Sequence, residues 1–173
     1  DILVKIDIFH QKDDGNFEIY EVKSSTWHNN KSIKEIGKYI PDAAIQYYVL
    51  RGLGYNISDI YITLLNTDYV MGDELDIEQL FSHVNVTEEI LRLQHDIPSI
   101  LVDIREKLKD TVNEPNIDIG WHCKNPYDCD AYEYCWKTQK QIPDCSVFDI
   151  FLLNKNAKSM QLYREGITKV EDI

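Results

Sequence analysis

The chain has 173 residues, of which 43% are apolar and 28% are charged, a composition that suits one compact globular domain with a small appendage. Thirty acidic residues against eighteen Lys and Arg give a formal charge of -12, which argues against a broad basic surface for nucleic acid, although local patches rather than the sum decide such binding. The sequence contains neither a long apolar run nor a secretory signal, so we expect a cytoplasmic protein with no membrane span.

The N-terminal part of the chain predicts a β-hairpin. The runs 1–9 (DILVKIDIF) and 17–22 (FEIYEV) alternate in part between apolar and polar residues, and Asp14-Gly15 lies in the polar segment between them. Two such runs around a tight turn are typical of strand, turn and strand. Because the pattern already begins at residue 1, we expect a fragment of a longer parent chain, truncated at its N-terminus.

A loop and a helix are expected after the hairpin. Residues 24–40 are polar and carry several lysines without a clear period. An apolar helical stretch then begins at Pro41-Asp42 and ends at Gly52 or Gly54, in accord with the usual start and stop signals of helices.

The rest of the chain predicts one buried strand and several helices. The run 59–65 (DIYITLL) is typical of a buried strand, and 75–81 (LDIEQLF) of a short helix. A longer helix is expected from Thr87, as its N-cap, to about Val112, with a kink or division at Pro98. The order strand, strand, helix, strand, helix predicts an α/β fold with a mixed sheet flanked by helices.

The second strand of the hairpin carries a possible catalytic group. Period-two geometry places Glu21 and Lys23 on one face and Val22 on the other. With the turn at 13–16, the register places Asp7 roughly opposite Val22, within reach of both Glu21 and Lys23. Two acids and one base are therefore expected to converge.

This grouping suits phosphodiester hydrolysis. The oxygens of Asp7 and Glu21, with the carbonyl of Val22, are the kind that Mg²⁺ or Mn²⁺ prefers, and the cation lowers the pKa of a bound water. Lys23 would orient that water or offset charge on the phosphate, and the amide of Gln46 on the following helix would hydrogen-bond to either. Taken singly, each residue is more often an ordinary surface residue, so the prediction depends on the combination.

The segments VKIDIF, FEIYEVKSST and YIPDAAIQYYVL resemble the RecB-like branch of the PD-(D/E)XK nucleases, which includes the AddB and RecB recombination nucleases and the CRISPR spacer-acquisition nucleases. The resemblance implies a restriction-endonuclease-like fold and metal-dependent DNA cleavage of exonuclease type. It makes Asp7 the acid of the second motif, Glu21 and Lys23 the E-x-K of the third, and Gln46 the glutamine of the fourth. Asp1 is the alternative to Asp7.

The chain departs from this family at two points. The acid or histidine of the first motif has no counterpart, which fits truncation, and Leu50 stands where the family has a tyrosine. The fragment alone is therefore expected to be of uncertain activity. The substrate expected is DNA, single-stranded or at an end, with a phosphate backbone that follows Lys31, Lys34 and Lys38.

All four cysteines of the chain lie close together, as Cys123, Cys129, Cys135 and Cys145. Clustered thiols in a chain without a secretory signal more often bind zinc or an iron–sulfur cluster than form disulfides. Their spacing does not match common zinc modules, and four thiolates suit [4Fe–4S] as well as zinc. The resemblance implies that the first three hold a cluster together with a cysteine upstream of residue 1. Reduced cysteines packed among aromatic residues are the alternative.

The sequence thus predicts a nuclease core at 1–118, a cysteine-rich metal or cluster segment at 119–146, and a helical tail or linker to a further domain at 147–173. The predicted function is metal-dependent DNA cleavage in processing, repair or defence. Two alternatives stay open: a catalytically silent, nuclease-like interaction module of a larger protein, and a regulatory domain that binds zinc or an iron–sulfur cluster.

Overall fold

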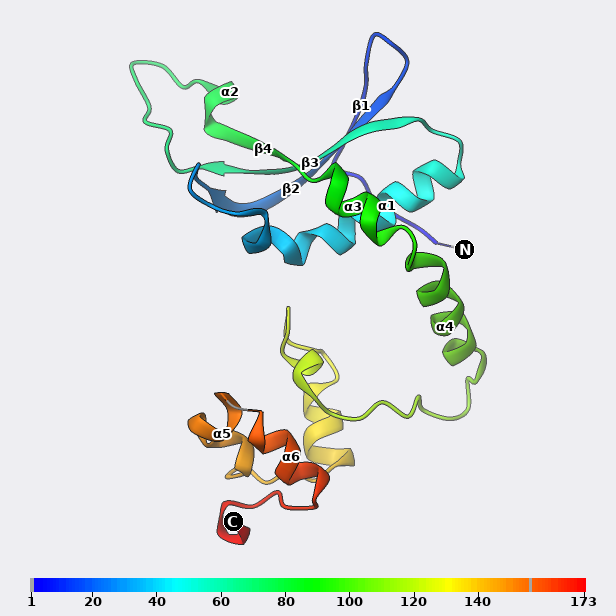
Figure 1. Cartoon of the computed structure of the whole chain (residues 1–173), viewed down its shortest axis with the longest axis vertical. Coiled ribbons are helices and arrows are strands. Elements are labelled where there is room, and N and C mark those ends of the chain that lie inside the picture. Colours follow the sequence, from blue (N-terminus) through cyan, green and yellow to red (C-terminus); the bar gives the residue numbers. More distant parts are fainter. Residues whose placement is uncertain (1, 156) are drawn as a thin grey trace. The chain divides into compact units, whose positions relative to one another are not determined.

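The computed structural model describes residues 2–155 and 157–173, apart from the side chain of residue 155. The chain forms two compact units that divide between residues 112 and 113 (Figure 1). Asp1, the alternative to Asp7, lies outside the described residues. Across the described ranges, every helix is too short or too polar to cross a membrane.

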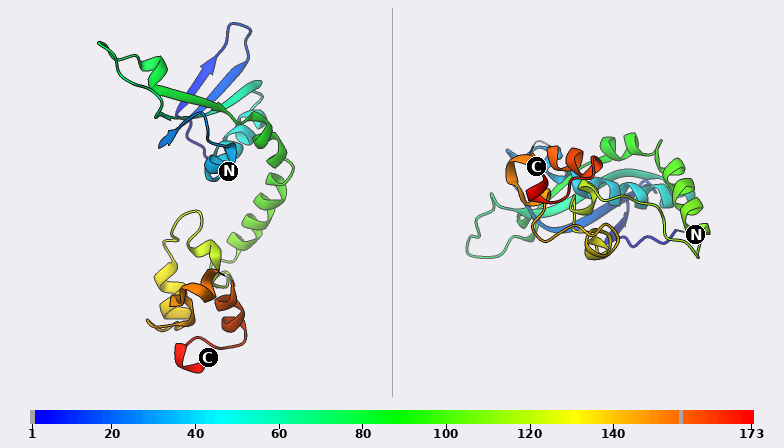
Figure 2. Two further views of the ribbon diagram at one scale, coloured as in Figure 1. Left: turned by 60° about the vertical axis from the view of Figure 1, so that its left-hand side comes forward. Right: turned by 90° about the horizontal axis from the view of Figure 1, so that it is seen from below.

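Unit 1 is built on a four-stranded sheet. The strands are β1 (Ile8–Gln11), β2 (Phe17–Trp27), β3 (Ile57–Asn66) and β4 (Phe81–Asn85). They lie side by side in this order, with β2 and β3 parallel and the two outer pairs antiparallel (Figures 1 and 2). The predicted α/β class with a mixed sheet is confirmed.

The first strand of the hairpin, β1, is shorter than predicted. The turn is closed by Lys12 N donating to Asn16 O at 2.8 Å, and Gly15 adopts a φ of 83°, which a residue without a Cβ tolerates best. Pairing ends at Ile8, so the expected strand is wrong over the described residues 2–7. One reason is local. The amide of Val22 on β2 donates to the side chain of Asp7 rather than to a backbone carbonyl of the opposite strand.

The helices of unit 1 have the bounds η1 (Ile33–Tyr39, a 3₁₀ helix), α1 (Ile40–Gly52), α2 (Ile77–Leu80), α3 (Thr87–Leu93) and α4 (Ile97–Lys109). Helices α1 and α3 pack against each other and against β3 (Figure 1). The residues of β3 that face them, Ile60, Ile62 and Leu64, are completely buried. The core of unit 1 therefore lies between the sheet and these two helices.

Three details of unit 1 differ from the expected elements. The segment 24–40 is not one loop, because β2 continues to Trp27 and η1 follows. Strand β4 was not predicted. Its first residue, Phe81, was expected to end a short helix, but it pairs with β3 instead. Thr87 does not cap α3; its hydroxyl accepts a hydrogen bond from Ile60 N at 2.9 Å, and Val86 is the N-cap. The predicted division at Pro98 is confirmed, because α3 and α4 are separate helices.

Unit 2 consists of short helices around a small core of its own. They are η2 (Trp121–Cys123), the π-helix η3 (Tyr134–Gln139), η4 (Val147–Asp149), α5 (Phe151–Lys155), α6 (Lys158–Arg164) and η5 (Val170–Asp172).

The predicted boundaries at 118 and 146 are not those of the structure. Phe148 and Tyr163 from the tail pack against the buried cluster that contains Cys123 and Trp136, which joins the tail to the cysteine-rich segment. Tyr163 Oη also donates to Asp118 at 2.7 Å, so residues before 119 belong to the same unit. The tail is thus part of a folded unit rather than a separate extension.

Candidate active site

The carboxylate of Glu21 is buried on β2. Ile19 and Glu21 are 0% and 5% exposed, whereas Val22 between Glu21 and Lys23 is 41% exposed. Alternation along the strand therefore turns Glu21 toward the face that carries the core. Burial of an ionised carboxylate is costly unless its oxygens are hydrogen-bonded. Both oxygens of Glu21 have such partners.

Lys23 lies on the same face of β2 as Glu21 and binds two carboxylates. Its ammonium group forms an ion pair with Glu21 Oε1 and donates to Asp42 Oδ2 at 2.8 Å. Burial is the strongest single influence and lowers the pKa of Lys23, but the hydrogen bonds to Asp42 and Glu21 outweigh it and raise the pKa above its ordinary value. Lys23 therefore stays protonated at neutral pH, so it supplies positive charge and hydrogen-bond donors rather than a base.

Gln46 provides the second partner of Glu21. Its Nε2 donates to Glu21 Oε2 at 2.7 Å, and its side chain is 3% exposed. Asp42 lies four residues earlier on the same face of α1. The sequence analysis did not predict its role beside Lys23, although this spacing from Gln46 could have indicated it. Leu50, which replaces the tyrosine of the resembled family, is 5% exposed and belongs to the core.

Asp7 lies directly before β1 and is exposed. Its Oδ2 accepts a hydrogen bond from Val22 N at 2.9 Å. Because Ile8 pairs with Tyr20, extending the register by one residue sets Asp7 across from Glu21 instead of Val22. The expected proximity to Val22 still holds through this hydrogen bond.

One structural observation indicates that the residues around Glu21 suit a divalent cation. Gln46 Oε1 is buried and has no hydrogen-bond partner among the described residues, so it is an acceptor that suits a water beside a cation. Each carboxylate oxygen has two lone pairs, so Glu21 can accept its present hydrogen bonds and still coordinate. Within the described ranges, no three His, Cys, Asp or Glu side chains are grouped as a metal site. The predicted set has two carboxylates and one carbonyl, and Mg²⁺ commonly completes such a set with water.

Tyr39 is a neighbour of the site that the sequence did not indicate. It is 8% exposed, and the ammonium groups of Lys23 and Lys38 lie 5.7 and 5.0 Å from its ring centre. A hydrogen bond with Ser25 lowers the pKa of Tyr39, burial opposes this, and the charge of Lys38 adds to the lowering. The ring thus forms an apolar, electron-rich wall beside the cation of Lys23.

The three lysines expected to follow a phosphate backbone each have a different environment. Lys31 donates to the carbonyl of Thr26 at 2.8 Å, which fixes its ammonium group near the end of β2. Lys34 is exposed on η1, and Lys38 contacts the ring of Tyr39. Contact of these lysines with DNA stays a prediction.

The four cysteines are free thiols in unit 2. Cys123 is buried and Cys135 is half-buried, and both belong to the small core, whereas Cys129 and Cys145 are exposed. The amide of Cys129 donates to the carbonyl of Cys123 at 2.9 Å, so the backbones of these two residues meet at the ends of one short loop. No three of the four are grouped as a metal site in the described ranges. A bound cluster or zinc ion stays a prediction.

The residues brought together at Glu21 come from the hairpin and from α1, the two segments on which the sequence prediction depends. Asp42 and Tyr39 join them from the start of α1 and the end of η1. Comparisons with protein-family models, with curated proteins and with solved structures found no match to this chain.

Proposed function

We propose that this chain is a metal-dependent nuclease of the PD-(D/E)XK type that hydrolyses phosphodiester bonds in DNA. The observation that carries the proposal is the buried carboxylate of Glu21, with Lys23 on one oxygen and Gln46 on the other. An ordinary surface ion pair would account for Lys23 alone. It would not account for a buried amide that holds the carboxylate and leaves its own acceptor, Gln46 Oε1, without a partner among the described residues.

The proposed roles follow from the chemistry of each side chain. Asp7, Glu21 and the carbonyl of Val22 would hold Mg²⁺ or Mn²⁺, which when bound lowers the pKa of a coordinated water. The ammonium of Lys23 offsets the negative charge that develops on the phosphate during attack. Gln46 Oε1 accepts a hydrogen bond from the attacking water and so fixes its direction.

Removal of the Lys23 charge tests the proposal. We expect Lys23→Met to lower the rate of Mg²⁺- or Mn²⁺-dependent DNA cleavage by about a hundredfold, since a donor aimed at developing charge contributes about that much. The substrates are end-labelled single strands and duplexes with one labelled end, and product lengths on a sequencing gel give the rate. Lys107→Met is the matched control, because Lys107 is exposed on α4 and the same charge is lost.

Two outcomes would contradict the proposal. Cleavage that persists in excess EDTA, or that Lys23→Met and Lys107→Met reduce equally, would contradict the proposed site. Circular dichroism of both variants shows whether each retains the fold, because Lys23→Met leaves the buried Glu21 with Gln46 as its remaining partner.

A catalytically silent interaction module is the second candidate. It is favoured by the two hydrogen bonds that already occupy the oxygens of Glu21 and by the formal charge of -12. Under this alternative, Glu21, Lys23 and Gln46 join β2 to α1 and have no further role. Absence of cleavage by the unmodified chain with either cation on every substrate would favour it.

A cysteine-bound cluster or zinc ion is a separate proposal about unit 2. We expect protein purified without oxygen to contain about four iron atoms, or one zinc ion, per chain. Metal analysis and the visible absorbance of thiolate-bound iron measure this. Replacement of Cys123 by Ser should remove the metal, and Ser146→Ala serves as a control for disturbance of the same small unit. Protein that contains neither metal would support reduced, packed cysteines.

A further inference from the structure

The two carboxylates that bind Lys23 differ in how firmly they are held. The side chain of Glu21 is 7% exposed, and Gln46 Nε2 donates to its second oxygen at 2.7 Å. The side chain of Asp42 is 54% exposed and accepts a hydrogen bond from Lys23 Nζ at 2.8 Å. Ion pairs that water reaches are weak, because solvent screens them and both side chains lose freedom. Asp42 is therefore the partner that Lys23 can exchange most easily.

Asp42 also lies on the accessible side of Lys23. The lysine side chain is 22% exposed, so water reaches part of it. The buried Glu21 takes one direction, and the buried ring of Tyr39 lies with its centre 5.7 Å from the ammonium group. A group that approaches from solvent therefore meets Lys23 beside the half-exposed Asp42 rather than beside these two buried side chains. An incoming phosphate and Asp42 would compete for the same ammonium group.

The charges around Lys23 add to this competition. Asp7, Glu21 and Asp42 supply three carboxylates against one ammonium group, which gives these four side chains a net charge of -2. A bound divalent cation would bring that charge to zero, which offers a phosphodiester no net attraction. Without the charge of Asp42, the same site would be positive by one unit. Asp42 therefore opposes an anion mainly by occupying Lys23, and also by its own charge.

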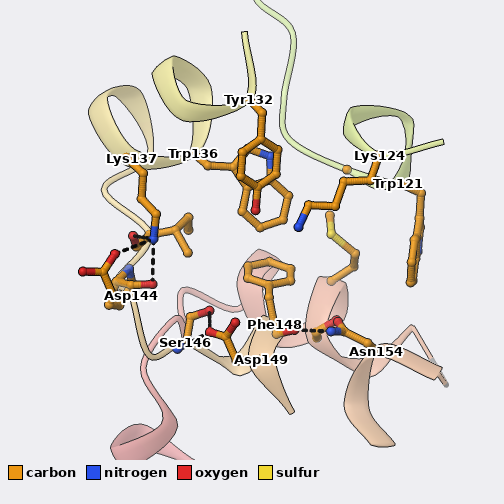
Figure 3. A pocket seen from close by; sticks show the side chains of 15 residues that line it. Trp121, Lys124, Tyr132, Trp136, Lys137, Asp144, Ser146, Phe148, Asp149 and Asn154 are labelled. Carbon is orange, nitrogen blue, oxygen red and sulfur yellow. Dashed lines mark hydrogen bonds and ion pairs between the residues drawn. The ribbon is translucent and has the colours of Figure 1, made fainter. Parts of the chain in front are cut away.

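Lys137 in the pocket of unit 2 is a contrasting case, because fixed groups hold it (Figure 3). Its ammonium group donates to the backbone carbonyls of Ile142 and Pro143, each at 3.2 Å, and to Asp144 at 2.9 Å. An ammonium group has three hydrogens, so each of them has an acceptor here, and two of these acceptors belong to the backbone. Lys23 is bound by two side chains instead, and one of them is half-exposed.

We propose that Asp42 is a positioning residue that occupies the place of a DNA phosphate on Lys23 and leaves it when a strand binds. The inference rests on the proposed function, because it takes Lys23 as the group that receives the phosphodiester. In the free chain, the pair with Asp42 keeps the ammonium group beside Glu21. On binding, a phosphate replaces one carboxylate at Lys23, and the half-exposed Asp42 returns to water.

Removal of the Asp42 carboxylate tests this exchange. We expect Asp42→Ala to bind DNA about threefold more tightly, because an exposed ion pair that must be broken on binding weakens affinity by a small factor. Alanine is a good helix former, so α1 should persist. Fluorescence anisotropy of an end-labelled single strand gives the dissociation constant. Ca²⁺ replaces Mg²⁺ in this titration, because it takes the same kind of oxygen ligands, and a gel shows whether the strand stays intact.

Asp144→Ala is the matched control. Asp144 is fully exposed, binds Lys137 at 2.9 Å and carries the same charge as Asp42. Its loss also takes a carboxylate from a lysine, but from one that the proposed site does not use. The dissociation constant for DNA should stay unchanged in this variant.

A double-mutant cycle with Lys23→Met shows whether Asp42 acts through Lys23. In the Lys23→Met chain, the gain from Asp42→Ala should fall below about 1.5-fold, because only the screened repulsion by Asp42 remains. With Lys23 present, Asp42→Ala should lower the KM of Mg²⁺-dependent cleavage by about threefold and leave kcat unchanged, since lost competition acts equally on bound substrate and transition state. A merely structural Asp42 would not produce this combination.

The outcomes separate this inference from the proposed function. An equal gain with Asp144→Ala, an undiminished gain without Lys23, or weaker or unchanged binding by Asp42→Ala in a chain that cleaves DNA would each overturn the exchange at Lys23 and leave the nuclease proposal standing. If the unmodified chain neither binds nor cleaves DNA with any of these cations, the proposed function fails, and the exchange fails with it.

Discussion

Replacement of Asp7 by asparagine is expected to reduce metal-dependent DNA cleavage by at least about a thousandfold. Asparagine retains an oxygen that can accept the hydrogen bond from Val22 N, which is 2.9 Å long in the structure. It removes the negative charge that a divalent cation requires of a ligand. Because Asp7 is exposed and precedes β1, the fold should persist. Initial cleavage rates over a range of Mn²⁺ concentrations measure the effect.

Asp13→Asn is the control for this substitution. Asp13 is an exposed residue of the same hairpin, in its turn, and the variant loses the same charge. Its cleavage rate should equal that of the unmodified chain. An Asp7→Asn chain that cleaves at the rate of the Asp13→Asn chain would show that Asp7 holds no catalytic cation.

Truncation of Ile62 to alanine is expected to lower the free energy of unfolding by about 3 kcal/mol. Ile62 is completely buried on β3, which pairs with strands on both sides. Loss of the side chain removes apolar burial and leaves a cavity between the sheet and its helices, and a central strand has little freedom to close it. Urea unfolding followed by circular dichroism gives the free energy.

Leu65→Ala is the comparison for Ile62→Ala. Leu65 lies on the same strand but is 41% exposed, so its truncation should cost less than about 1 kcal/mol. Similar losses for the two variants would indicate that the core does not lie on the Ile62 face of the sheet.

The sequence was most informative where one local pattern decides the structure. The alternation of β2 and the turn around Gly15 determine the hairpin, and the apolar run of β3 determines the buried strand. The pyrrolidine ring of Pro98 cannot continue a helix from the preceding turn, so the division of α3 from α4 was predictable. Gln46 was found by its place one helix after the hairpin, and it does bond to Glu21.

The sequence was least informative where pairing between distant segments decides the structure. Strand β4 has only five residues, and nothing in FSHVN separates it from the short helix before it; its hydrogen bonds to β3 make it a strand. Tyr39 reaches the site because η1 turns its ring toward Lys23, a contact that no local pattern encodes.

Unit 2 shows the same limit. The cysteine spacing suggested a segment defined by metal ligands, whereas the aromatic residues of the tail and of the cysteine-rich segment form one core. Contacts such as that between Phe148 and Trp136, at 4.7 Å between ring centres, join parts that the spacing of cysteines treats as separate. Aromatic packing of this kind has no period that a single sequence reveals.

The alternation along β2 also determines how errors in folding would affect activity. Ile19 and Glu21 face the core, and Val22 faces the other way. A slip of one residue in the pairing of β2 would exchange these faces, so Ile19 and Glu21 would both enter water. The same mistake would thus remove core packing and separate Glu21 from Gln46. Molecules with this one-residue slip would be inactive rather than altered in specificity, because Glu21 could no longer face Gln46.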